Sequence, residues 1–291
     1  MAGSDVSIAF VGSGGAGVLT VGGMLLEAAC AAGWHGFLTR SVGAQIRGGE
    51  AAAMLRLAPH PIDCHSDCFD LLIGIDWQNA QRFEAEIPLG AHSLVFGDPR
   101  GGDRPQSIAA AGARAIDVPF KDIIKSRPDW RPNMIALGLA AKLIGLPADA
   151  LRAALSKRFG EHGSAALEAN LAAVDAGAAA AAGSELGHPL SAPTKSTAKR
   201  WLISGNEAAA LGAVRGGIRF AAAYPITPAT DILEWLAANL ARIGGVMLQA
   251  EDELASINMI IGASYGGTPA LTATSGPGLS GSRPQPRFPS S

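Results

Sequence analysis

Three short motifs in the last third of the chain carry residue types that could hold a ligand together. Residues 224–228 read YPITP, residues 251–253 read EDE, and residues 272–278 read TATSGPG. Each proline fixes its own φ angle and restricts the residue before it, so Thr227 is expected in a stiff turn that presents its hydroxyl. The glycine-rich motif follows an apolar run and is expected at the carboxyl end of a strand, where open α/β folds bind ligands.

Each of these motifs also has an ordinary structural interpretation. Thr227 can cap a helix that starts at Pro228, because proline is favoured in the first helical position. Acidic residues in a first helical turn suit the helix dipole. One of the three acidic residues could instead turn inward, where burial raises its pKa and lets it share a proton with a ring nitrogen. The order and spacing of the three motifs are more specific than any one of them.

A glycine-rich segment near the N-terminus has the spacing of a phosphate-binding turn. Residues 12–17 read GSGGAG, after the apolar run 6–11 and before an apolar helical stretch at 18–32. Such glycines allow a tight turn that brings backbone N–H groups and a helix N-terminus against a phosphate. The candidate residues are Gly12, Gly14, Gly15 and Gly17.

The ligand of this turn stays open from the residues alone. A dinucleotide-binding fold needs an acidic residue about 20 positions further on. Residues 34–41 offer Thr39 and Arg40 there, but no carboxylate. Three interpretations stand side by side: NADP bound through Arg40, another phosphate-bearing ligand, and a tight turn without a ligand.

Two further segments carry reactive residue types. Arg47 is followed by two glycines, which suits a guanidinium beside exposed backbone amides and hence an anion. A loop with a surface arginine explains the same pattern. Cys64 and Cys68 lie near His60 and His65, but their spacing matches no common zinc motif, and we expect an ordinary loop and no metal site.

Composition narrows the class of protein. The 291 residues include 23 basic and 25 acidic ones, so the charge gives no reason to expect nucleic acid or a membrane surface as a partner. The N-terminus lacks the basic start of a secretory signal. Residues 6–26 carry no charge but hold six glycines, which favours strand, turn and helix over a membrane span. Three cysteines are too few for a disulfide framework or for an iron–sulfur cluster, which predicts a cytoplasmic protein.

Alternating strands and helices predict an α/β fold with a mainly parallel sheet. In a first module, strands are expected at 6–11, 51–57, 71–75 and 94–96, and helices at 18–32, 133–144 and 148–158. In a second module, strands are expected at 219–223, 246–249 and 270–273, and helices at 206–216, 228–242 and 252–265. The stretch between them, 183–199, is rich in Ser, Pro and Gly and is predicted to be a linker.

The second module resembles the start of the α subunit of the 2-oxoacid:ferredoxin oxidoreductases. The motifs that carry the resemblance are GNEAxALGA at 205–213, YPITPxT at 224–230, Q-x-E-x-E at 249–253 and TSGPG at 274–278. The first module is similar to the γ domain of the same family, with GxGGxGV at 12–18 and IRGG at 46–49. The resemblance implies a γ-type α/β domain over 1–182, the linker 183–199, and a partial pyrimidine-type thiamine-diphosphate-binding α/β domain over 200–280.

Residues 281–291 depart from the family pattern, which continues with a further helix after TSGPG. They are expected to be a tail foreign to the family, as a truncation or frameshift would leave. An isolated chain is then expected to be inactive.

The resemblance also implies a chemistry and a set of partners. Thiamine diphosphate promotes oxidative decarboxylation of a 2-oxoacid such as 2-oxoglutarate or pyruvate, coenzyme A takes up the acyl group, and electrons pass to ferredoxin. The thiamine site is expected to be shared with a β subunit that carries the diphosphate-binding half. Magnesium and iron–sulfur clusters are expected only on that partner. An NADP-binding Rossmann-type protein and an inactive truncated fragment are the alternatives.

Roles for single residues follow from the same resemblance. In thiamine enzymes the catalytic glutamate opens a helix that reaches a glycine nine positions later, which holds for Glu253 and Gly262. Glu251 is the second choice, as a cofactor-binding residue. The substrate is expected to face Tyr224, Pro225, Ile226, Thr227 and Pro228. Cofactor contacts are expected from Ser275, Gly276 and Pro277 and from the glycines of 12–17. Arg47 is a candidate for the anionic end of coenzyme A.

Overall fold

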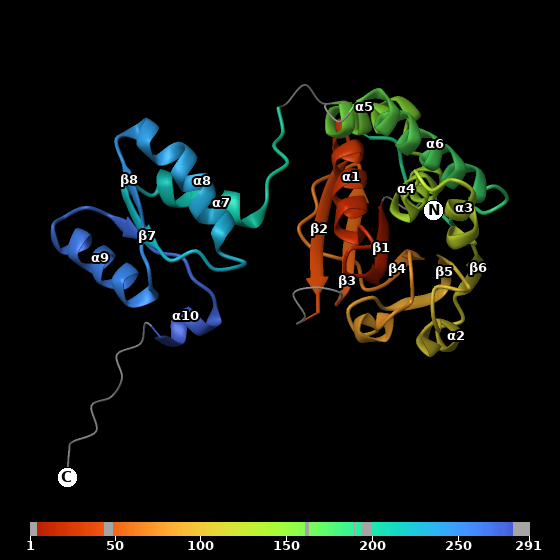
Figure 1. Cartoon of the computed structure of the whole chain (residues 1–291), viewed down its shortest axis with the longest axis horizontal. Helices are drawn as coiled ribbons and strands as arrows, with labels where there is room; N and C mark the ends of the chain where they lie inside the picture. Colours follow the sequence, from red (N-terminus) through yellow and green to blue (C-terminus); the bar gives the residue numbers. More distant parts are fainter. Residues whose placement is uncertain (1–4, 44–48, 161–162, 189, 194–198, 282–291) are drawn as a thin grey trace, which may run out of the picture. The chain divides into compact units, whose positions relative to one another are not determined.

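The computed structural model describes residues 5–43, 49–160, 163–188, 190–193 and 199–281. The chain divides into two compact units, Met1–Lys199 and Arg200–Ser291, and each has its own sheet (Figure 1). Both units combine strands with covering helices, so the predicted α/β class is confirmed. Among the described residues, no helix is both long and apolar enough to cross a membrane.

The larger unit is built on a six-stranded sheet in the order β2-β3-β1-β4-β5-β6. Only β3 runs against its neighbours, since it pairs antiparallel with β1 and β2, while β1, β4, β5 and β6 pair in parallel. The mainly parallel sheet is therefore confirmed. The strands are β1 Val6–Ser13, β2 His35–Val42, β3 Glu50–Ala58, β4 Phe69–Gly74, β5 Leu89–Gly97 and β6 Arg114–Asp117.

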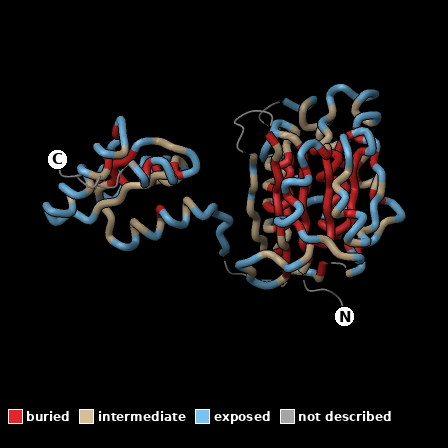
Figure 2. The backbone as a smooth tube through the Cα atoms, turned by 90° about the horizontal axis from the view of Figure 1, so that it is seen from below, coloured by how far each residue is buried: buried red, intermediate tan, exposed pale blue. Residues whose placement is uncertain are grey.

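Both faces of this sheet are apolar, as expected for strands buried on two sides. Along β1, Ile8 and Phe10 belong to one core cluster, and Ala9 and Val11 to the other. Figure 2 shows the buried residues concentrated along these strands. Helices cover the first face: α1 Val18–Ala31, α3 Phe120–Ser126, α4 Pro132–Leu143, α5 Ala148–Phe159 and α6 Ser164–Ala180. The second face is covered by η1 Ala80–Phe83 and α2 Gln106–Ala110.

Helices α4 and α6 pack backbone against backbone at two glycines. A Cβ atom added to Gly138 would lie 2.6 Å from the carbonyl carbon of Val174. One added to Gly177 would lie 2.7 Å from the carbonyl carbon of Ile135. No real side chain fits at such distances, so this crossing depends on glycine at both positions.

Much of the predicted linker packs on the larger unit. Leu186 and Leu190 are buried in its main core cluster. The indole Nε1 of Trp34 donates a hydrogen bond to the carbonyl of Ser191 at 2.7 Å, and His188 Nε2 lies 3.0 Å from an oxygen of Asp70. Residues 194–198 lie outside the described part.

The loop between β3 and β4 holds a half-buried histidine, His65. His65 Nε2 lies 2.6 Å from the hydroxyl of Thr39, and its ring contacts Phe37 edge-on, with centroids 5.0 Å apart. Burial, followed by the charge of Arg56, lowers the pKa of His65 below its ordinary value. No cluster of His, Cys, Asp or Glu that could hold a metal occurs in the ranges described above.

We expect this histidine to make the larger unit less stable in acid. As the pH falls, the histidine of the unfolded chain takes up a proton at a higher pH than that of the folded chain, because the pKa is lowered in the folded state. The contribution of His65 to the free energy of unfolding is therefore fully present above about pH 6.5 and is lost as the pH drops below that value. The slope stays under about 1.4 kcal/mol per pH unit, the limit for one proton. Urea denaturation between pH 5 and 8 should show a shallower pH dependence for His65→Gln than for the wild type; equal slopes would contradict the assignment.

The smaller unit has three parallel strands in the order β8-β7-β9. Ala221 of β7 faces α7 and α8, and Ala222 on the opposite face is also fully buried, where α9 contacts β7. All three strands were predicted, and their presence is confirmed. The elements are α7 Gly205–Arg215, β7 Phe220–Ala223, α8 Thr230–Asn239, η3 Leu240–Ile243, β8 Val246–Gln249, α9 Glu253–Tyr265, β9 Ala270–Leu271 and α10 Gly276–Gly281.

Helix α8 begins later than the sequence predicts. Thr227 and Pro228, expected as its N-cap and first residue, lie in the preceding turn, and Ala229 occupies the N-cap position. The N–H groups of Ala229 and Thr230 donate to the carbonyl of Ile226, at 2.8 and 3.1 Å. The prediction that Thr227 caps the helix is therefore wrong, because a backbone carbonyl does that work.

Candidate functional site

The order of the strands places two of the sequence motifs at one end of the smaller sheet. β8 and β9 flank β7 on opposite sides. The connection after β7 therefore leads to one side of the sheet and the next connection leads back to the other side, which makes the boundary between β7 and β9 a topological switch point. Open α/β folds bind ligands outside the carboxyl ends of the strands at such a point. The YPITP motif, residues 224–228, follows β7, and the TATSGPG motif, residues 272–278, follows β9.

The acidic motif divides its roles among its three residues. Asp252 caps α9, since its Oδ1 accepts the N–H of Ala255 at 2.6 Å. Glu253 is the first residue of the helix and is half-buried. Its carboxylate makes no hydrogen bond or ion pair with any described residue. Glu251 is exposed. Because Asp252 does the capping, the carboxylate of Glu253 is available for another partner.

Glu253 lies against the TATSGPG turn. A Cβ atom added to Gly278 would be 2.6 Å from Oε1 of Glu253 and would overlap the hydroxyl of Thr274. The Thr274 hydroxyl oxygen is buried and has no hydrogen-bond partner in the described structure. Buried polar atoms are rarely left without a partner. A carboxylate and a hydroxyl that lack protein partners thus converge on one small space.

The YPITP turn is held by a residue to which sequence reasoning gave no role of its own. Asn206 of α7 donates through Nδ2 to the carbonyl of Pro228 at 2.8 Å. Thr227 and Tyr224 are exposed, and the Thr227–Pro228 peptide bond is cis. Pro225 and Ile226 are half-buried. The turn therefore presents Tyr224 and Thr227 to its surroundings.

The proposed pocket residues of the TATSGPG motif lie at the start of α10. Ser275 is half-buried, and its carbonyl accepts the N–H of Leu279 at 2.9 Å. Gly276 and Pro277 are exposed. This short helix thus begins beside Glu253.

In the larger unit, the glycine turn links β1 to α1 and is clamped at both ends. Gly15 and Gly17 have positive φ angles of 95° and 82°, which glycine adopts without strain. At the start, the carboxylate of Asp76 accepts the N–H of Ser13 at 3.0 Å and its hydroxyl at 2.7 Å. At the end, Asn133 Nδ2 lies 3.4 Å from the carbonyl of Gly17.

Neither Asp76 nor Asn133 was singled out from the sequence. Each comes from a distant segment, and no spacing rule connects it with the glycines. Gly12, before the turn, is buried and lies close to Asp76. The N–H of Gly14 donates to the carbonyl of Gly49, so the turn contacts the last residue of the IRGG motif. Arg47 itself lies outside the described residues.

A cleft of about 750 Å³ opens beside this turn. Its volume is in the range of sites for small molecules and cofactors. Its lining comes from the turn, from the start of α4 and from α6, and includes Gly15, Gly17, Thr20, Arg131, Asn133 and Asn170.

The arrangement differs from that of a dinucleotide-binding fold. In those folds the second strand lies directly beside the first. Here the antiparallel β3 lies between β1 and β2. Arg40, the candidate for an NADP phosphate, is exposed on β2 and pairs with Ala53 of β3. The NADP alternative therefore lacks the geometry it needs.

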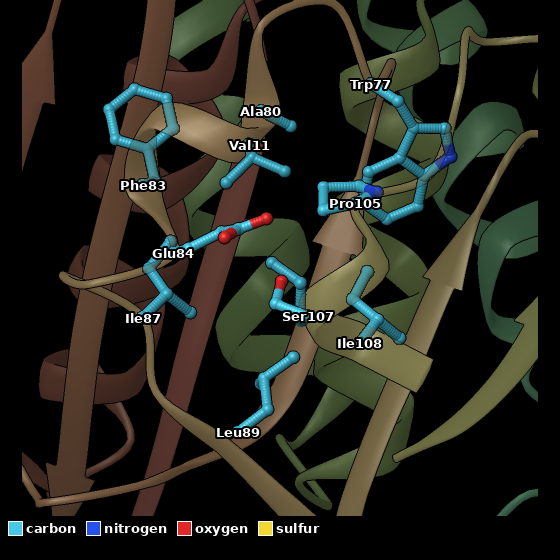
Figure 3. Close-up of a pocket in the computed structure, with 11 residues that line it drawn as sticks. Val11, Trp77, Ala80, Phe83, Glu84, Ile87, Leu89, Pro105, Ser107 and Ile108 are labelled. Carbon is cyan, nitrogen blue, oxygen red and sulfur yellow. The ribbon is translucent and has the colours of Figure 1, made fainter. Parts of the chain in front are cut away.

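A second cavity in the larger unit is too small for a cofactor. It measures about 20 Å³ and lies among apolar side chains such as Val11, Trp77, Phe83 and Ile108 (Figure 3). A space of this size holds a single water molecule. The cleft at the glycine turn is the better candidate for a ligand in this unit.

Two family profiles match the chain, one in each unit. The sequence profile of the pyruvate ferredoxin/flavodoxin oxidoreductases matches residues 7–180, more than half of the chain. The chain belongs to this family. The thiamine-diphosphate-binding profile of the pyruvate flavodoxin/ferredoxin oxidoreductases matches residues 211–285, which include the YPITP, EDE and TATSGPG motifs.

Solved and curated members of the oxidoreductase family are similar to one or both units. The 2-oxoglutarate:ferredoxin oxidoreductase of Magnetococcus marinus, solved with 2-oxoglutarate, coenzyme A and succinyl-CoA bound, superposes with a TM-score of 0.83 and 33% identity over 95% of this chain and 48% of that one. The 2-oxoglutarate synthase subunit KorA of Methanocaldococcus jannaschii is 55% identical over 78 residues, 27% of this chain and 21% of its own.

The α subunit of the 2-oxoacid:ferredoxin oxidoreductase of Saccharolobus solfataricus is 32% identical over 192 residues, 58% of this chain and 29% of its own. The chain thus spans about half of the solved relative and less than a third of the two curated ones.

Proposed function

We propose that the chain is part of a thiamine-diphosphate-dependent 2-oxoacid:ferredoxin oxidoreductase and holds the pyrimidine end of the cofactor in its smaller unit and coenzyme A in its larger one. The observation that carries the proposal is the position of Glu253. Its carboxylate is released from helix capping by Asp252 and faces the buried hydroxyl of Thr274, at the end of the sheet where ligands bind.

The residues at this point fit the pyrimidine ring of thiamine diphosphate. When bound, this cofactor stabilises the carbanion that forms as a 2-oxoacid loses carbon dioxide. Glu253 would hold a proton at a ring nitrogen, and Thr274 would exchange a hydrogen bond with the ring. Ser275, Gly276 and Pro277 would line the ring pocket, with Glu251 at its edge.

The YPITP turn would face the substrate. A hydroxyl such as that of Thr227 can donate to the carboxylate of a 2-oxoacid, and Tyr224 can do the same through its phenol. Pro225 and Pro228 would keep the turn rigid, which limits the entropy lost on binding. Ile226 would add an apolar contact. The substrate class is a 2-oxoacid such as 2-oxoglutarate or pyruvate.

Coenzyme A would lie in the cleft of the larger unit. The glycine turn and the uncapped start of α1 offer backbone N–H groups, which favour a diphosphate. Gly12 would allow the close packing below the turn, Gly14, Gly15 and Gly17 would approach the ligand, and Arg47 would add a positive charge.

The remaining parts of the reaction need partners. We propose a β subunit that supplies the diphosphate- and magnesium-binding half of the thiamine site together with iron–sulfur clusters, and ferredoxin as the electron acceptor. We also propose a cytoplasmic location, because three cysteines are too few for a disulfide framework.

Binding of coenzyme A tests the proposal for the larger unit. We expect the full chain to bind coenzyme A in isothermal titration and Gly17→Ala to weaken binding at least about tenfold, because the added Cβ would overlap Asn133 at a positive φ angle. Gly23→Ala, in an open position of α1, should bind as the wild type does. Saturable binding of NADPH without binding of coenzyme A would refute the proposal.

A further inference from the structure

Two helices begin at the cleft beside the glycine turn. α1 starts after Gly17 and α4 after Arg131, and both residues line the cleft. Neither of these two described helix starts has a side-chain cap. The positive ends of two helix dipoles therefore meet at one cleft, which suits a ligand with two separate anionic groups.

The charged side chains of the cleft leave one uncompensated cation. Asp129 lines the cleft but pairs with Arg127 at 3.4 Å, and the hydrogen bond from Arg127 lowers the pKa of the Asp129 carboxyl. Arg131 contacts only the carbonyl oxygens of Pro128 and Trp130, each at 3.4 Å, and has no carboxylate partner in the described ranges. The cleft thus has a guanidinium at the start of α4 that is available to an anion.

A buried amide is an independent sign that the cleft takes a polar ligand. Asn133 is only 8% exposed and lines the cleft. Its Nδ2 faces the carbonyl of Gly17, while its Oδ1 accepts no hydrogen bond from any described residue. Oδ1 is not among the side-chain atoms that are both closed off from solvent and unpartnered, so a donor that enters the cleft can reach it. An N–H or O–H group of a bound molecule would supply that donor.

We propose that Arg131 binds the 3′-phosphate of coenzyme A, so that the cleft binds coenzyme A in preference to dephospho-coenzyme A. This proposal rests on the proposed coenzyme A site. Coenzyme A carries two separate anionic groups, a diphosphate and a 3′-phosphate, and dephospho-coenzyme A lacks the second. The glycine turn holds the diphosphate, and the fork of donors on Arg131 matches a phosphate. Asn133 accepts from a hydroxyl or amide of the same ligand.

The test compares both ligands on the same variants of the full chain by isothermal titration. The wild type should bind coenzyme A roughly ten- to a hundredfold more tightly than dephospho-coenzyme A, the range for charge-assisted hydrogen bonds. Arg131→Gln should remove that preference and leave the binding of dephospho-coenzyme A unchanged. Arg131→Lys should keep part of the preference for coenzyme A, because lysine also carries a positive charge. Arg114→Gln removes an exposed charge on β6, outside the cleft. This control variant should keep the full preference for coenzyme A.

Two results would overturn this proposal without touching the coenzyme A site. One is equal binding of the two ligands by the wild type. The other is a loss in Arg131→Gln that affects both ligands alike, since that would reflect general attraction of anions. If the wild type binds neither ligand, the coenzyme A site and the role of Arg131 both fall.

Discussion

Glu253→Gln is expected to lower 2-oxoacid-dependent electron transfer by at least about a hundredfold in the chain assembled with its partner subunit. The amide is close in shape to the carboxylate, but it cannot share a proton with a pyrimidine nitrogen. Reduction of a viologen dye with 2-oxoglutarate as substrate measures the loss. The melting temperature should stay unchanged, because the carboxylate of Glu253 makes no hydrogen bond or ion pair with a described residue.

Glu251→Gln compares the second candidate of the same motif. Glu251 is exposed and lies two residues earlier, at the edge of the proposed ring pocket, so its variant should lose much less activity than Glu253→Gln. Loss of activity in Glu251→Gln together with full activity in Glu253→Gln would reverse the assignment. Equal activity in both variants would remove the acidic motif from the mechanism.

Gly177→Ala and Gly138→Ala are each expected to destabilise the larger unit by about 3 kcal/mol or more, at the upper end of the range for overpacked cores. Each added methyl group would meet the backbone of the facing helix, which cannot move aside as a side chain can. The helices must separate along the whole α4–α6 contact. Urea denaturation followed by tryptophan fluorescence measures the change.

Gly23→Ala controls for the general effect of alanine in a helix. No atom lies within 4 Å of a Cβ at this position in α1, so the variant should gain about 0.5–1 kcal/mol from helix propensity. Wild-type stability in Gly177→Ala and Gly138→Ala would mean that the two helices do not cross as described. It would also change the cleft, since both helices line it.

The strongly apolar parts of the fold could be predicted from the sequence. β1, β3 and β4 are almost wholly buried runs, and β5 is buried over its second half. Such runs signal strands buried on both faces. β2 and β6 escaped prediction because they lie at the edges of the sheet and are polar in sequence, HGFLTRSV and RAID. The antiparallel β3 could not be foreseen either, since strand direction depends on contacts distant in sequence.

In the candidate site, too, the features set by neighbouring residues could be predicted and those set by distant residues could not. Local motifs predicted the turn after β7, the glycine turn after β1 and the helix at Glu253, because tight turns and helix starts are set by nearby residues. Asp76 and Asn133 were missed because they reach the glycine turn from distant segments. Thr227 was predicted to cap α8, but the carbonyl of Ile226 accepts the first N–H groups of the helix instead. The local sequence alone does not determine whether a side chain or a backbone carbonyl accepts them.

The most direct test of the central claim is reduction of a viologen dye by the chain purified together with its partner subunit. We predict that reduction requires 2-oxoacid, thiamine diphosphate and coenzyme A together, and that an acyl-coenzyme A thioester forms in step with it. Reduction that proceeds equally without thiamine diphosphate, or without this chain, would contradict the assignment of the chain to the thiamine and coenzyme A sites.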